Sequence, residues 1–169
     1  MPDPMEHAEN RGWLEEVLRR IPGFRGYLEK EYRRESDRLQ RQWLIDRLQR
    51  SKRGLDALTR SLVDTGEVDA LPQWERVRGK LDQLIGRIRG AVHGYSGVFD
   101  LVTVDEAVLD QVYEHDAALV NQVDELAAIV ENLDKDETPP AQRAGQLLDR
   151  AELIARHWDE RADILKGLD

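Results

Sequence analysis

The chain of 169 residues contains no cysteine, which excludes disulfides, thiolate metal sites and cysteine nucleophiles. It also lacks any run near the ~18 apolar residues that a membrane-spanning helix needs. Residues 1–10 lack the basic start and apolar segment of a signal peptide. We therefore expect a cytoplasmic protein, with residues 1–10 as a flexible tail and residues 11–169 as one domain.

Apolar residues recur at helical spacing in five segments, and no strand-like alternation extends beyond four residues. The expected helices cover residues 13–21, 28–63, 72–92, 103–133 and 138–165. Thr103 with Glu106 forms a capping-box pattern, and Thr138 followed by Pro139 predicts another helix start. The predicted fold is an all-α, up-and-down antiparallel four-helix bundle, with an additional short N-terminal helix capping one end.

Charge is distributed unevenly within a formal net charge of −9. Residues 11–60 hold 14 basic and 8 acidic residues, whereas residues 101–140 hold 11 acidic residues and the single base Lys135. One interpretation is that a basic and an acidic helix pack side by side and neutralise each other. The other is that the basic segment faces an anionic partner, such as a membrane surface. A pI near 5.0 makes nucleic acid an unlikely partner.

Asp116 is the carboxylate that the pattern places inside the bundle, between Val112 and Leu119. A buried carboxylate is costly unless it is paired, so we expect a structural link to an arginine, to Ser51 or to Ser61. A catalytic or ligand-binding role for Asp116 is the alternative.

Patterns that would indicate a metal or phosphate site are missing from the sequence. The histidines, none of which has a glutamate three positions before it, are His7, His93, His115 and His157. A ferritin-like Glu-x-x-His metal site is therefore not expected, and no phosphate-binding glycine loop occurs. We assign no catalytic residue, metal or cofactor. Gly86, Gly90 and Gly94 form a small-residue stripe, for which we expect close packing against another helix.

Aromatic and arginine residues gather at the predicted end of the bundle where the second helix begins and the third ends. The residues that we expect to bind a partner there are Trp13, Arg19, Arg20, Phe24, Arg25, Tyr27, Tyr95 and Phe99. Aromatic residues and arginine are enriched in binding hot spots. The alternative is that these side chains form a minor core that caps the bundle.

The leading functional hypothesis is a non-enzymatic interaction or scaffolding protein that binds a protein partner through this end. A second hypothesis is a peripheral membrane protein that uses its N-terminal amphipathic helix on an anionic surface. A third is a helical enzyme or small-ligand carrier with a site near Asp116. The heptad stripe within residues 28–63 further suggests a homo-oligomer formed through the long helix.

Overall fold

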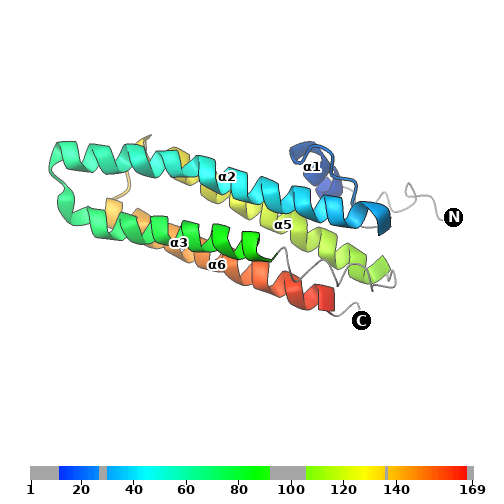
Figure 1. The fold of residues 1–169 in the computed structure, drawn as a ribbon. Coiled ribbons are helices and arrows are strands. Elements are labelled where there is room, and N and C mark those ends of the chain that lie inside the picture. Colours follow the sequence, from blue (N-terminus) through cyan, green and yellow to red (C-terminus); the bar gives the residue numbers. More distant parts are fainter. Residues whose placement is uncertain (1–11, 27–29, 92–105, 136, 167–169) are drawn as a thin grey trace.

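A computed structural model describes residues 12–26, 30–91, 106–135 and 137–166 (Figure 1). The helices are α1 (Gly12–Arg20), α2 (Lys30–Thr65), α3 (Leu71–Gly90), α5 (Glu106–Glu131) and α6 (Pro140–Lys166). Two short 3-10 helices, η2 (Val68–Ala70) and η3 (Leu133–Lys135), lie in the turns. No strand occurs in these residues, and the predicted all-α helical bundle is confirmed.

The observed helix boundaries follow local capping chemistry. α2 ends at Thr65 because Gly66 adopts a left-handed conformation with φ of 77°. The backbone N–H of Glu67 then donates to the carbonyl of Leu62, as in a Schellman motif. α6 begins at Pro140, one residue after Pro139, the residue expected to follow the cap Thr138. Proline suits this first helical position because the backbone N–H that it lacks would have no acceptor within the helix. Thr103, the expected start of the fourth helix, lies outside the described residues.

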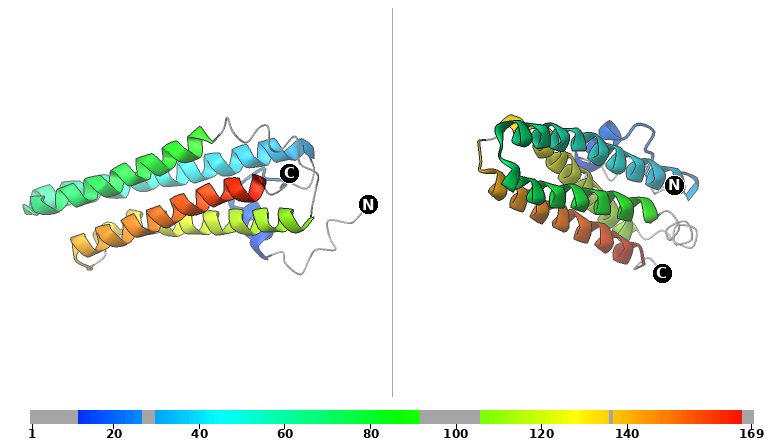
Figure 2. Two further views of the ribbon diagram at one scale, coloured as in Figure 1. Left: turned by 90° about the horizontal axis from the view of Figure 1, so that it is seen from below. Right: turned by 60° about the vertical axis from the view of Figure 1, so that its left-hand side comes forward.

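The four long helices form two antiparallel hairpins, α2–α3 and α5–α6. Their directions are fixed by the ion pairs Lys52–Asp82 and Arg78–Asp56 in the first hairpin, and Arg161–Asp116 and Arg150–Glu125 in the second. The hairpins lie side by side, so that α2 neighbours α5 and α3 neighbours α6 (Figure 2). Consecutive helices alternate in direction, as predicted, but α3 and α5 occupy diagonal positions in the bundle.

Neighbouring helices from different hairpins therefore run parallel. The parallel direction of α3 and α6 follows from the pairs Lys80–Glu152 and Arg87–Asp159. α2 comes so close to the end of α5 that a Cβ atom at Gly54 would overlap the backbone of Val130. In contrast, the predicted close packing at Gly86 and Gly90 is wrong. Both face outward, and a Cβ atom there would meet no atom within 4 Å. Gly94 lies outside the described residues.

The heptad stripe of α2 faces the core. Its members, Leu44, Leu48, Ser51, Leu55, Leu58 and Leu62, are all buried. The five leucines pack with apolar side chains of the other three long helices in one continuous core. None of the described helices is long and apolar enough to cross a membrane.

The short α1 lies across the flank of the bundle against α5, in the half that contains the start of α2 (Figures 1 and 2). Val17, Ile21 and Phe24 bury their side chains there. Arg20 adds a 2.9 Å ion pair with Asp124 of α5. The apolar face of α1 is thus used within the fold.

Arg47 links the basic α2 to the acidic α5. Its Nε atom lies 2.7 Å from Asp124 and its Nη1 atom 2.5 Å from Glu131. Burial lowers the pKa of Arg47, but hydrogen bonds with Glu131 and Asp124 outweigh it and leave the pKa raised. These contacts support the interpretation in which the two charged segments neutralise each other inside the fold.

Replacing Arg47 by leucine should lower the free energy of unfolding by about 1 kcal/mol, because both carboxylates are partly exposed and therefore screened. Urea unfolding at low and at ~1 M salt would test this, since salt should shrink the difference between variant and wild type. Arg60→Leu, at an exposed position of the same helix, is the matched control and should change stability much less. An equal loss in both variants would contradict the interhelical role of Arg47.

Candidate functional site

The residues predicted to bind a partner divide into three groups. The side chains that lie outside the described part of the structure are those of Trp13, Tyr27, Tyr95 and Phe99. Phe24 and Arg20 are engaged within the fold. Arg19 and Arg25 are exposed. The structure therefore brings only part of the predicted surface into view.

Phe24 is a correction to the predicted binding surface. Only 4% of it is exposed, and it belongs to the hydrophobic core. The reason is that the chain after α1 folds back over α5, so that Phe24 continues the buried face of Val17 and Ile21. Arg20 is likewise committed to Asp124. These two residues fit the alternative interpretation, a minor core at this part of the bundle.

The outer side of α1 and the following turn remains available to a partner. Leu18 is 43% exposed, and Arg19, Pro22 and Arg25 are exposed beside it in the chain. Leu18 lies at the border of the buried face formed by Val17 and Ile21, and Arg19 lies farther from it on the exposed side. We call Leu18, Arg19, Pro22 and Arg25 the outer α1 surface.

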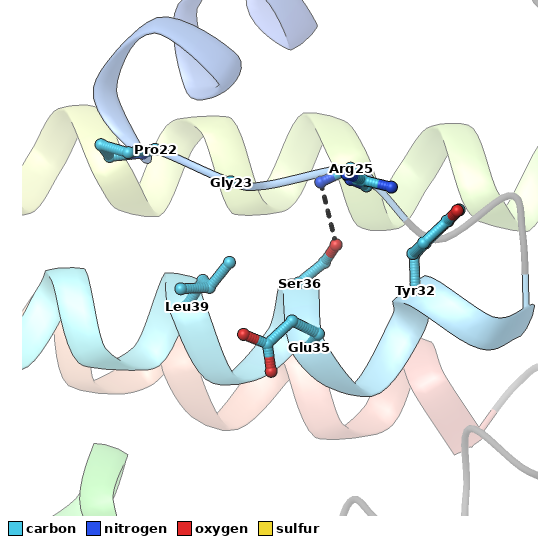
Figure 3. A pocket seen from close by; sticks show the side chains of 7 residues that line it. All are labelled: Pro22, Gly23, Arg25, Tyr32, Glu35, Ser36 and Leu39. Atoms are coloured by element: carbon cyan, nitrogen blue, oxygen red, sulfur yellow. Dashed lines mark hydrogen bonds between the residues drawn. The ribbon is translucent and has the colours of Figure 1, made fainter.

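A groove separates this turn from α2 and has a volume of about 460 Å³ (Figure 3). This junction groove is lined by Pro22, Gly23, Arg25, Tyr32, Glu35, Ser36 and Leu39. Two glycines with positive φ, Gly23 and Gly26, allow the chain to turn here. Gly26 also lies so close to the hydroxyl of Tyr113 that a Cβ atom would overlap it.

Polar contacts hold the two sides of the junction groove together. The backbone N–H of Arg25 donates to Ser36 Oγ at 3.1 Å, and its guanidinium lies 4.7 Å from the centre of the Tyr32 ring. Glu35 accepts hydrogen bonds from Arg38, and these are the main cause that lowers the pKa of Glu35. The groove therefore combines apolar walls with an ionised carboxylate and an arginine.

Asp116 lies in a buried polar cluster. Its two carboxylate oxygens accept hydrogen bonds from Arg161 Nε at 2.6 Å and Nη2 at 3.2 Å. Arg161 is 0% exposed, and its Nη2 atom also lies 2.8 Å from Asp37 and 3.2 Å from Gln40. Asp37 in turn pairs with Arg41 at 2.8 Å.

This cluster connects three helices, because Arg161 belongs to α6, Asp116 to α5 and Asp37 to α2. Such a set of mutual ion pairs fixes the relative positions of the helices, as expected for a structural role of Asp116. Neither the junction groove nor the second surface depression, described below, includes Asp116. The cluster therefore has the geometry of an interhelical link.

His115 and His157 form a half-buried pair between α5 and α6, with ring centres 5.8 Å apart. His115 Nε2 lies 2.5 Å from the carbonyl oxygen of His157, and because a carbonyl only accepts, this nitrogen is the donor. His157 Nδ1 lies 2.8 Å from Gln122. Among the side chains that the structure describes, no three potential metal ligands lie close enough to hold an ion.

Two surface features were missed from the sequence. Val63 and Val68 are 54% and 51% exposed at the α2–α3 turn. A second depression of about 550 Å³ lies along α2, lined by Trp43, Asp46, Gln49, Arg50 and Arg53. The heptad spacing of these α2 residues was the available signal, but the stronger leucine stripe obscured it.

The described residues thus provide an exposed outer α1 surface, a junction groove beside it and a buried cluster in which Arg161 pairs with Asp116 and Asp37. Each feature can be attributed to particular side chains of this chain. Comparison with protein-family models, with curated proteins and with solved structures found no match.

Proposed function

We propose that the protein is a non-enzymatic helical interaction or scaffolding protein that binds a protein partner through the outer α1 surface and the adjoining junction groove. The observation that carries this proposal is the exposure of Leu18 beside Arg19 and Arg25, next to a groove with apolar walls. An apolar anchor flanked by arginines is a composition typical of binding hot spots. The proposal places the protein in the cytoplasm.

The geometry favours this function over the two alternatives. A peripheral membrane role would insert the apolar face of α1, but Val17 and Ile21 are packed within the fold. That role would therefore require α1 to detach from α5. An enzyme or ligand carrier near Asp116 would need space beside its carboxylate, and Arg161 occupies both carboxylate oxygens.

The proposal is tested by affinity capture with charge-reversing variants from cells that naturally produce the protein. Leu18→Glu and the pair Arg19→Glu with Arg25→Glu should each reduce recovery of a specific partner by about tenfold, because interface charges of the wrong sign repel. The melting temperature should change little for Leu18→Glu, whose side chain is exposed, and should fall only modestly for the arginine pair, in which Arg25 loses its contact with the Tyr32 ring.

Val68→Glu is the matched control, because Val68 is an equally exposed apolar residue at the opposite end of the bundle. It should leave partner recovery unchanged. Loss of recovery in Val68→Glu, or full recovery in all the α1 variants, would contradict the proposed surface.

A further inference from the structure

Two arginines of the outer α1 surface keep their guanidinium N–H groups available to a partner. Arg19 and Arg25 are exposed, and neither forms an ion pair with a carboxylate among the described residues. Arg20 differs from them, because it is committed to Asp124 of α5. The exposed Leu18 therefore lies on a surface that carries two positive charges not neutralised within the fold.

Arg25 is held in place without the use of its guanidinium N–H groups. The guanidinium lies 4.7 Å from the centre of the Tyr32 ring, and the backbone N–H of Arg25 donates to Ser36 Oγ. Stacking on an aromatic ring restricts a long side chain before it binds, so that less conformational entropy is lost on binding. A planar guanidinium can donate two parallel hydrogen bonds to a carboxylate. The position of Arg25 therefore suits recognition of a carboxylate.

The acidic residue of the junction groove does not oppose this preference. Both carboxylate oxygens of Glu35 accept hydrogen bonds from Arg38, at 3.0 and 2.6 Å. This pair is neutral as a whole, so that Arg25 supplies the unneutralised charge among the side chains that line the groove. Glu15 is exposed earlier in α1, but residues 17–26 contain three arginines and no acidic residue. The surface and the groove together complement a partner of negative charge.

We propose that the partner of this surface presents one contiguous acidic segment with an apolar anchor residue. The anchor enters the junction groove between Pro22 and Leu39, which face each other across it (Figure 3). A carboxylate of the same segment binds Arg25, and a second carboxylate meets Arg19 beside Leu18. This inference rests on the proposed function, because it specifies the partner of the same surface.

Selection of a random peptide library on the full chain tests this inference. The wild type should enrich peptides in which Asp or Glu lies within about four positions of a large apolar residue. These peptides should bind the pair Arg19→Glu with Arg25→Glu at least about tenfold more weakly, since like charges then meet. The matched control is Arg60→Glu with Arg76→Glu, which changes the net charge equally at exposed positions elsewhere. It should change the affinity less than about twofold.

Two further measurements examine the role of charge and of the stacked arginine. Selection on the chain with glutamate at positions 19 and 25 should enrich Lys and Arg in place of Asp and Glu, with the apolar anchor retained. Tyr32→Leu keeps an apolar wall but removes the stacking, so it should weaken the acidic peptides by about threefold. Acidic peptides selected equally well by the wild type and by the charge-reversed chain would overturn the inference.

The outcomes of the selection separate this inference from the proposed function. Peptides that lose binding in Leu18→Glu but contain no enriched acidic residue would overturn the acidic partner and leave the proposed surface intact. Peptides that bind Leu18→Glu and the arginine pair as they bind the wild type would contradict the proposed surface itself. A selection that enriches no peptide on the wild type would overturn the inference, since it requires one contiguous segment.

An anionic membrane is the other ligand that exposed arginines attract. Vesicles of phosphatidylcholine and phosphatidylserine test it, because the inference predicts that they neither sediment the full chain nor displace the selected peptides. Co-sedimentation of the wild type that is abolished by Arg19→Glu with Arg25→Glu would assign the surface to a membrane and overturn the inference.

Discussion

Replacing Arg161 by methionine should lower the free energy of unfolding by about 3–5 kcal/mol, because it leaves a buried carboxylate without its cation. Arg161 is fully buried, and it contacts Asp116, Asp37 and Gln40. Asp37 would keep Arg41, whereas Asp116 would lose both hydrogen bonds from the guanidinium. Chemical denaturation measures the loss directly.

Variants of Asp116 test whether the loss in Arg161→Met comes from the Arg161–Asp116 pair. Asp116→Leu should be less damaging than Arg161→Met, because Arg161 would keep its contact with Asp37 at 2.8 Å. The double variant Arg161→Met with Asp116→Leu should be more stable than Arg161→Met alone, since both members of a buried pair are then apolar. If the two losses simply add, the pair does not act as a unit and the structural role of Asp116 is contradicted.

Replacing Gly54 by alanine should lower the free energy of unfolding by about 2 kcal/mol, despite the ~1 kcal/mol advantage of alanine in a helix. The new methyl group would overlap the carbonyl group of Val130, and backbone cannot move aside as a flexible side chain can. α2 and the end of α5 would have to separate. Thermal or urea unfolding gives the value.

Gly79→Ala and Gly86→Ala provide matched controls within α3. Both glycines are exposed in a helix interior, and a Cβ atom at either would meet nothing within 4 Å. These changes should raise stability by about 0.5–1 kcal/mol. Stabilisation by Gly54→Ala of the same size would contradict the close approach of the two helices.

The fold was predictable because apolar periodicity identifies each helix by itself. The apolar spacing from Leu44 to Leu62 marks one face of α2, and every member of this stripe is buried in the core. The arrangement of the helices was harder to predict, because alternating directions leave open which helices lie on the diagonal. That choice depends on contacts between distant residues, such as Arg47 with Asp124. The position of α1 on the flank of α5 depends on similar contacts.

The site was less predictable than the fold. The burial of Asp116 followed from its register, but Arg161 could not be singled out among 20 arginines. The aromatic end was identified from composition, which does not distinguish a buried phenylalanine from an exposed one. Phe24 belongs to the core, whereas Leu18, which is neither aromatic nor charged and was not among the predicted binding residues, is exposed. The glycines of α3 did not indicate close helix packing, because glycine also occurs on the solvent-exposed side of a helix, as at Gly86 and Gly90.

Photocrosslinking from position 18 tests the proposed function most directly. A photoreactive amino acid at Leu18 and, separately, at Val68 places the same probe at two exposed apolar positions on opposite ends of the bundle. In cells that naturally produce the protein, the account predicts a discrete crosslinked partner from position 18 and none from position 68. The same pattern from both positions, or a partner captured only from position 68, would contradict it.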